Sequence, residues 1–244
     1  MVNNTLKGYA IYPDAVQIRT PKEVNKLNSE KWSNSPDFEL TEVDEFDFPF
    51  RNILMETIRN TYFHVPLWFS MIFIFLASMI NSIKYLRNDF DVQYDIKSKA
   101  LIEIGVLFGI LGTVTCGILA QFTWGAFWSF DIKQNMTAIT LLIYLAYFVL
   151  RSSFDDDQQK ARLAAIYNIF AFTSIIPLLF IIPRMYDSLH PGNGGNPAFG
   201  GEDLDNTMRT VFYPAIIGFT LLGFWIANIL TRINNVRQQL IDRM

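Results

Sequence analysis

Long blocks of uncharged apolar residues follow one another along the chain after about residue 60, separated by short stretches in which charged residues return. A helix needs roughly 20 predominantly apolar residues to cross the hydrocarbon core of a bilayer. These blocks are too long and too apolar for strands. The pattern therefore predicts an all-α, polytopic helical membrane protein. Its five predicted spans lie at approximately 65–83, 100–121, 137–151, 161–182 and 211–231.

The composition agrees with this class. The 244 residues are 51% hydrophobic and 15% aromatic, a combination that soluble domains rarely show. The net charge of −3 does not describe the membrane part of the chain, because charges are concentrated in the first 60 residues and in the connections. The sequence shows no basic stripe of the kind that nucleic-acid binding needs. The single cysteine, Cys116, excludes an intrachain disulfide, and its apolar surroundings favour a small core residue.

The same polar and apolar pattern predicts three segments. Residues 1–52 form a polar, poorly structured tail, residues 53–232 form the membrane domain, and residues 233–244 form a cytoplasmic C-terminal tail. Five spans with the C-terminus inside place the N-terminal tail outside, yet that tail carries no secretory signal. Either a first span is missing from this sequence or replaced in it, which we favour, or reversed insertion of the first predicted span carries the tail across the membrane.

The distribution of lysine and arginine predicts the orientation, because basic residues are retained on the cytoplasmic side. The connections at 122–136 and 183–210 carry fewer basic residues than the other connections and the C-terminal tail. Both are therefore predicted to be external. His64, at the start of the first span, and His190, in the second of these connections, fall on the same external face.

His64 and His190 are the only histidines in the chain, and histidine is the commonest protein ligand for metals. Two imidazoles suit a six-coordinate haem iron better than structural zinc, which requires four ligands. Asp131 and Asp187 offer an alternative metal site, although no HxxxH or CxxC spacing supports one. Taken singly, His64 also fits a helix-end residue at the interface, and His190 fits a solvated turn.

Residues 124–131, Trp-Gly-Ala-Phe-Trp-Ser-Phe-Asp, form the most aromatic stretch on the external face. An interfacial aromatic belt explains one or two such residues but explains a dense cluster around a glycine less well. Aromatic faces can stack on a porphyrin, and glycine permits a close backbone approach. The candidate platform residues are Trp124, Gly125, Phe127, Trp128, Phe130 and Asp131.

Three short motifs together resemble a known family. Trp124-Gly-x-x-Trp-x-x-Asp131, His-Val-Pro at 64–66 and Ser-Leu-His at 188–190 are similar to segments of the "WWD" haem-handling proteins of cytochrome c maturation, which include CcmC, CcmF and CcsA. The short chain fits the CcmC type, although that family normally has six spans.

The sequence departs from the family motif at three positions. Phe127 and Phe130 stand where the motif is richer in tryptophan, and Lys133 stands near a usual arginine. Phenylalanine keeps the apolar face but loses the indole N–H donor, and lysine loses the bidentate fork of arginine. These changes bear on contacts to the edges and propionates of haem.

The resemblance implies a role. It implies that haem b is bound as cargo at the periplasmic face of the bacterial cytoplasmic membrane, with His64 and His190 as axial iron ligands and the 124–131 segment as platform. It further implies presentation to a CcmE-like chaperone within an ABC-type complex that contains a CcmA-like ATPase and a CcmB-like permease. The chain itself is not expected to be an enzyme.

Two alternatives stay open beside this reading. The chain could be a subunit that transports haem across the bilayer, or a structural membrane subunit of the maturation complex without bound haem. The few polar residues at mid-membrane depth favour display over transport, because such groups mark transport pathways.

Overall fold

The computed structural model describes residues 55–190, 204 and 206–241. Apart from Met55, these residues belong to one compact unit, Glu56–Met244. The predicted N-terminal tail, residues 1–52, lies outside the described residues, so its predicted lack of structure and the expected missing first span stay predictions.

All regular structure in the described ranges is helical. Five stretches are long and apolar enough to cross a membrane, which confirms the predicted polytopic helical membrane protein. The last helix continues beyond its predicted span into residues 233–241. The helices are α1 (Met55–Arg87), α2 (Val92–Trp124), α3 (Ile132–Ser152), α4 (Asp157–Ile175), η4 (Ile176–Ile181), α5 (Ile182–Met185) and α6 (Asn206–Ile241).

Aspartate side chains fix the starts of three helices. Asp91, Asp131 and Asp156 are the N-caps of α2, α3 and α4, and each accepts a hydrogen bond from a backbone N–H of the first turn. Such caps satisfy donors that have no partner within the helix. Gly125 ends α2 in the left-handed conformation, with φ of 79°, which glycine adopts without steric cost. These caps make the connection between α2 and α3 short and well defined.

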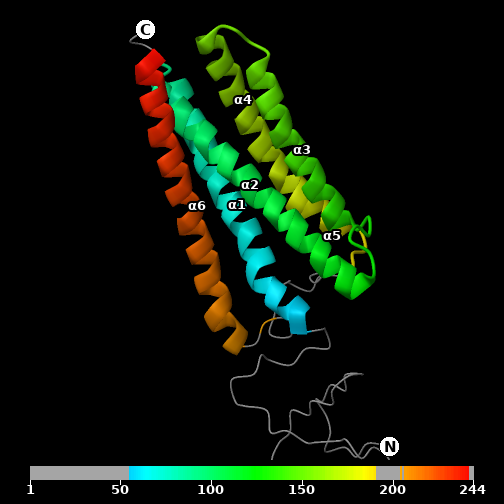
Figure 1. Cartoon of the computed structure of the whole chain (residues 1–244). Helices are drawn as coiled ribbons and strands as arrows, with labels where there is room; N and C mark the ends of the chain where they lie inside the picture. The colour runs from blue at the N-terminus through cyan, green and yellow to red at the C-terminus, as the bar shows by residue number, and fades with distance from the viewer. Residues whose placement is uncertain (1–54, 191–203, 205, 242–244) are drawn as a thin grey trace, which may run out of the picture. The chain divides into compact units, whose positions relative to one another are not determined.

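The helices run side by side as a bundle with two distinct ends (Figure 1). Helix α2 packs against α3 and α6, and α3 packs against α4. The α1–α2 and α3–α4 connections and the C-terminal end of α6 lie at one end. The 124–131 segment and the stretch after α5 lie at the other. We call this second end the histidine end, because both histidines lie toward it.

Buried polar side chains tie the helices together inside the apolar bundle. The Asn168 amide of α4 donates to Ser78 Oγ at 2.8 Å and to Ser82 Oγ at 2.9 Å, both on α1. Ser78 also donates to the Ser98 carbonyl oxygen of α2 at 3.0 Å. Hydrogen bonds between helices are favourable where no water can take their place. The polar groups at this depth therefore bond to one another and hold α1, α2 and α4 in register.

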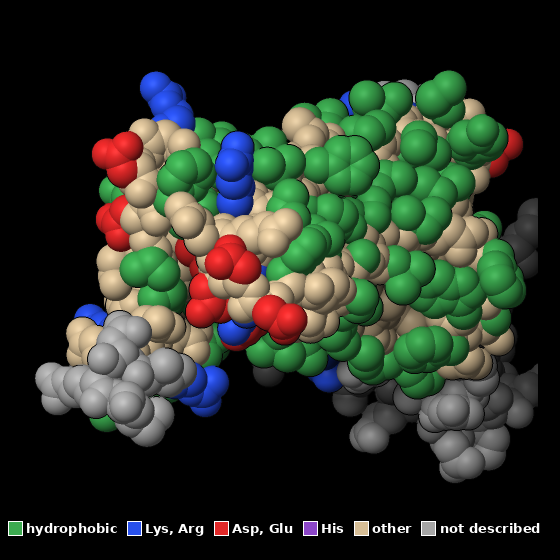
Figure 2. Space-filling model, turned by 90° about the horizontal axis from the view of Figure 1, so that it is seen from above, with side chains coloured by type: hydrophobic (Ala, Val, Ile, Leu, Met, Phe, Trp, Pro, Cys, Tyr) green, Lys and Arg blue, Asp and Glu red, His purple; other side chains and the backbone are tan. Residues whose placement is uncertain are grey.

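Large apolar side chains cover much of the outer surface. Figure 2 shows charged side chains gathered over part of the end that carries the C-terminus, while hydrophobic side chains cover much of the remaining visible surface. Leu142, Val149, Leu221 and Trp225 are each more than 60% exposed. Apolar exposure on this scale suits contact with lipid chains, in agreement with the spans.

The fourth span changes its helical form partway along. Pro177 lies at the start of η4, where six residues adopt the wider π-helical turn. Proline lacks the backbone N–H that an α-helical ladder requires, so the ladder is interrupted at this point. Beyond this point the chain continues through α5 toward His190.

Candidate functional site

His64, Cys116 and His190 meet at the histidine end of the bundle. They come from α1, from α2 and from the stretch after α5, and one ligand atom of each lies within 4.8 Å of the others. His64 and Cys116 are buried, and the His190 side chain is 12% exposed. The two histidines that the sequence placed on one face therefore share one small, largely buried space.

His64 lies deeper in its helix than the sequence suggested. The sequence placed it at the start of a span, but α1 begins at Met55, so about 13 Å of helix precedes His64. Its Nδ1 lies 3.0 Å from the carbonyl oxygen of Gly112 on α2. A carbonyl oxygen only accepts, so Nδ1 carries the proton and donates. The Trp68 indole N–H also points at this Nδ1, at 3.3 Å, but that bond needs the opposite tautomer, and the shorter contact with Gly112 selects the one protonated at Nδ1. Nε2 of His64 is left with a free lone pair for a ligand.

His190 is held by Asp131. Nδ1 of His190 lies 2.8 Å from Asp131 Oδ1, and the N–H of Leu189 donates to Oδ2 at 2.7 Å. Ser188 Oγ donates to Oδ1 at 3.1 Å, and so does the N–H of Lys133 at 2.9 Å. The Asp131 carboxylate thus joins the start of α3 to the segment that carries His190, and it directs His190 Nε2 into the shared space.

The Asp131 carboxylate remains ionised although it is buried. Burial alone would raise its pKa, but hydrogen bonds from His190 and from the Leu189 and Lys133 N–H groups outweigh that effect and hold the pKa well below its usual range. A carboxylate behind a ligating imidazole fixes its tautomer and increases its basicity. Metal-ligating histidines commonly have a carboxylate partner of this kind.

Among the platform residues, Trp124 and Phe127 have defined contacts. The Trp124 ring meets the His190 ring edge to face, with centroids 4.6 Å apart. Phe127 folds back over α2, where a Cβ at Gly117 would clash with its ring. The glycine therefore makes room for the aromatic ring.

The remaining platform residues lie in the same short connection. Gly125 is the left-handed end of α2, and Trp128 is partly buried. Phe130 has φ of 55°, and its side chain is 78% exposed.

Sequence reasoning missed two residues of the site. Cys116 was interpreted as a core residue, yet its Sγ lies 3.5 Å from His190 Nε2. Gln134 of α3 donates to the same sulfur at 3.8 Å, and its Oε1 accepts from Ser129. The signal for Cys116 was weak, since a lone cysteine in an apolar run is usually structural. Only the packing of α1 against α2 shows that it faces His64.

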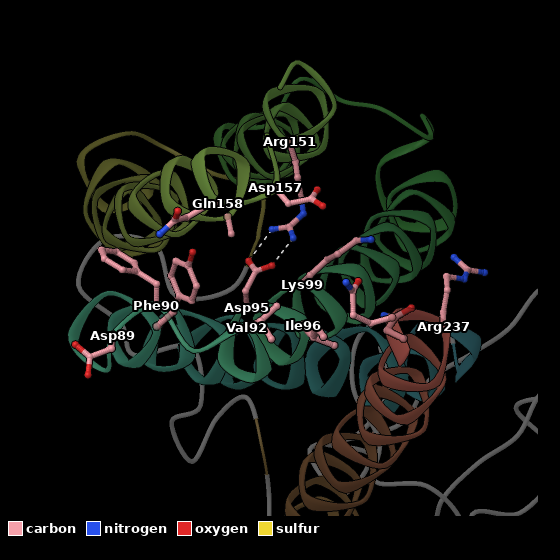
Figure 3. Close-up of a pocket in the computed structure, with 14 residues that line it drawn as sticks. Asp89, Phe90, Val92, Asp95, Ile96, Lys99, Arg151, Asp157, Gln158 and Arg237 are labelled. Carbon is pink, nitrogen blue, oxygen red and sulfur yellow. Dashed lines mark hydrogen bonds and ion pairs between the residues drawn. The ribbon is translucent and has the colours of Figure 1, made fainter. Parts of the chain in front are cut away.

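A cavity of about 370 Å³ lies at the opposite end of the bundle (Figure 3). The rise of α2 from Asp95 to Cys116 corresponds to about 31 Å, the thickness of a bilayer core. Arg151 Nη1 donates to Asp95 Oδ1 at 2.7 Å within this cavity. The other charged groups that line it are Asp89, Lys99, Asp157 and Arg237. Of these, Lys99 pairs with Glu103 and Asp157 pairs with Lys160.

This chain matches one known protein family over most of its length. The model of the CcmC family, "Heme exporter protein C", matches residues 51–243. The Heme exporter protein C of Paracoccus denitrificans is 24% identical over 184 residues, which cover 75% of this chain and 76% of that protein.

Two further relatives match over shorter stretches. The Heme exporter protein C of Haemophilus influenzae is 26% identical over 57% of this chain and 56% of its own length. A cytochrome c biogenesis protein CcsA from Pelargonium hortorum is 32% identical over 36% of this chain and 28% of its own length. The chain thus spans about three quarters of the Paracoccus protein and smaller shares of these two. Since the family model covers most of its length, the chain belongs to the Heme exporter protein C family.

Proposed function

We propose that this protein binds haem b as cargo at the histidine end and presents it to a CcmE-like haem chaperone for cytochrome c biogenesis. The observation that carries the proposal is the convergence of His64 and His190, the only histidines of the chain, into one largely buried space. Family membership supports a role in haem handling during cytochrome c maturation.

The histidine geometry fits a six-coordinate iron. Two imidazole nitrogens on opposite sides of one metal lie about 4 Å apart, if each bond is ~2.0 Å long as for zinc and imidazole. The ligand atoms of His64 and His190 lie within 4.8 Å of each other. Both rings use Nδ1 for hydrogen bonds to acceptors, so both keep Nε2 for the iron.

Haem entry requires one contact to open. Cys116 Sγ lies 3.5 Å from His190 Nε2, so the thiol stands where the iron would bind. The His190 segment must therefore move away from α2 while Asp131 keeps its hold on the ring. Trp124, which already meets the His190 ring, then offers an apolar face to the porphyrin.

We infer that the histidine end is external. The opposite end carries most of the basic residues of the connections, including Lys84 and Arg87 in the last turn of α1 and Arg151 in the last turn of α3. Such residues are retained in the cytoplasm. In a bacterium we therefore expect the site to lie on the periplasmic side of the cytoplasmic membrane.

In this proposal the chain positions haem and makes no covalent bond. A separate CcmA-like ATPase and a CcmB-like permease supply the energy in an ABC-type complex, and the exposed Phe130 is available for contact with the chaperone. The buried polar groups inside the bundle, such as Asn168 and Ser78, bond to one another, which favours display over passage through the bundle.

Absorption spectroscopy of protein purified from haem-replete cells tests the proposal. We expect a low-spin spectrum typical of two histidine ligands, which is lost in His64→Ala and in His190→Ala. Phe63→Ala and Leu189→Ala are matched controls, because each removes an exposed side chain next to a histidine. A colourless wild-type protein purified with its partners would support the structural-subunit alternative. An unchanged spectrum in either histidine variant would remove that residue as a ligand.

Transfer to the chaperone needs a separate assay. Co-expression with a CcmE-like chaperone, followed by a stain for covalently bound haem, should show loaded chaperone with the wild type. We expect little loading with His190→Ala and reduced loading with Phe130→Ala, which leaves both histidines in place. Full loading with both variants would contradict presentation by this end of the bundle.

A further inference from the structure

We propose that His64, Cys116 and His190 also form a site for a bare divalent transition-metal ion of the Zn²⁺ type, which excludes haem while it is bound. The inference concerns the closed arrangement, in which the three ligand atoms lie within 4.8 Å of one another. The metal site itself does not rest on the proposed function, whereas the exclusion of haem does, because it takes His64 and His190 as the haem ligands.

The separation of Cys116 and His190 already matches a metal site. With zinc–sulfur and zinc–nitrogen bonds of about 2.3 and 2.0–2.1 Å, two ligands at tetrahedral angles lie about 3.6 Å apart. Cys116 Sγ and His190 Nε2 are 3.5 Å apart. A small contraction brings His64 to the same ion, and the fourth position stays open.

Each ligand has a support that orients it. The Gly112 carbonyl oxygen accepts from His64 Nδ1, and the Asp131 carboxylate accepts from His190 Nδ1. Gln134 points its N–H at the Cys116 sulfur, because its Oε1 is fixed by the N–H and Oγ of Ser129. A carbonyl or carboxylate behind each imidazole is the outer shell that protein metal sites use.

The charge balance selects a divalent ion. The thiol loses its proton to solvent when sulfur binds the metal, so Cys116 contributes one negative charge and Asp131 a second. The two imidazoles are neutral, and a +2 ion makes the group neutral overall. Thiolate and imidazole ligands together favour zinc over magnesium or calcium, which prefer oxygen. Because the ion uses His64 and His190, it competes with haem.

Cobalt provides a spectroscopic probe of this site. The full chain, purified without a polyhistidine tag from haem-depleted cells, is titrated with Co²⁺. We expect one equivalent to bind with a thiolate-to-cobalt charge-transfer band, and Zn²⁺ to abolish that band by displacement. Cys116→Ser should lose the band and bind Co²⁺ at least about tenfold more weakly. Thr123→Ala is the matched control on α2, since the Thr123 hydroxyl bonds to Leu119 of its own helix.

Two outcomes of the cobalt titration overturn the inference. One is the absence of the band in the wild type, and the other is equal Co²⁺ affinity in Cys116→Ser. If that variant does not fold, the single thiol of the chain supplies another test. Zn²⁺ should slow alkylation of Cys116 in the wild type but not in His64→Ala or His190→Ala. Equal alkylation with and without Zn²⁺ in the wild type also overturns the inference.

The haem spectrum separates this inference from the proposed function. If wild-type protein binds Co²⁺ as described but binds no haem, the proposed function fails and the metal site stands. If haem binds and Co²⁺ does not, the proposed function stands and the inferred metal site fails.

Discussion

Replacement of Asp131 by asparagine tests the support behind His190. The carboxylate accepts four hydrogen bonds, from the His190 ring, the Ser188 hydroxyl and the N–H groups of Leu189 and Lys133. Asparagine keeps one oxygen and the shape of the side chain, but it loses the charge. It also turns an NH₂ group toward one of these donors, which leaves that donor without a partner.

The magnitude follows from these contacts. A hydrogen bond to a charged group contributes about 1.5–3 kcal/mol. Loss of that strength at His190 corresponds to roughly 10–100-fold weaker haem binding, which is also the usual effect of removing an outer-shell partner. The neutral amide stabilises ferric haem less well than the carboxylate does. The midpoint potential should therefore rise, by on the order of tens of millivolts.

Haem titration of the apoprotein, followed by its absorption band, measures the affinity, and a redox titration measures the potential. Asp187→Asn is the matched control, because Asp187 is an exposed acid three residues before His190. Haem affinity of Asp131→Asn within about twofold of the wild type, with an unchanged potential, would refute the proposed support. A lower affinity without any change in potential would point to a merely structural role.

Three further predictions concern stability and the platform. Asp95→Asn should destabilise the bundle by about 3–5 kcal/mol, because Arg151 is left as a buried charge without its carboxylate partner. Thermal unfolding measures this loss. The double variant with Arg151→Met should recover much of it. Gly117→Ala should displace Phe127, which lowers both the stability of the protein and its haem binding. The double variant with Phe127→Ala should restore the stability. A Gly117→Ala protein as stable as the wild type would argue against this contact. Asp131 has a lowered pKa, so its stabilisation is complete above the unfolded value of about 3.9 and is lost as the pH falls toward the folded pKa. The difference in melting temperature between wild type and Asp131→Asn should then stay constant from pH 7 to about 4 and shrink below, and a difference that shrinks already near pH 6 would contradict it.

Hydropathy predicted the spans well because bilayer thickness dictates helix length directly. The distribution of basic residues placed His64 and His190 on one face, because such residues are retained on one side of the membrane. Helix ends were predicted less well, since α1 begins before its apolar block and α6 continues after its own. Those turns carry polar residues that hydropathy excludes, although a helix tolerates them outside the hydrocarbon.

The site was predicted only in part because contacts between helices leave little trace in one sequence. The motif containing Trp124 and Asp131 indicated an aromatic platform, but it did not show that Asp131 bonds to His190. Cys116 was set aside because its neighbours in the sequence are apolar. Its role depends on which face of α2 meets α1, and the near-uniform apolar character of α2 gives no periodicity from which to infer that face.

The direction in which the His190 ring points depends on the number of residues in the π-helical turn at Ile176–Ile181, although α5 lies between that turn and the histidine in the chain. A wider turn accommodates about one more residue than an α-helical turn, and each residue rotates an α-helix by ~100°. Deletion of a single residue there would let the turn relax to α-helix and swing α5 and the following stretch around the helix axis. Asp131 and His190 would then point in different directions although neither had changed.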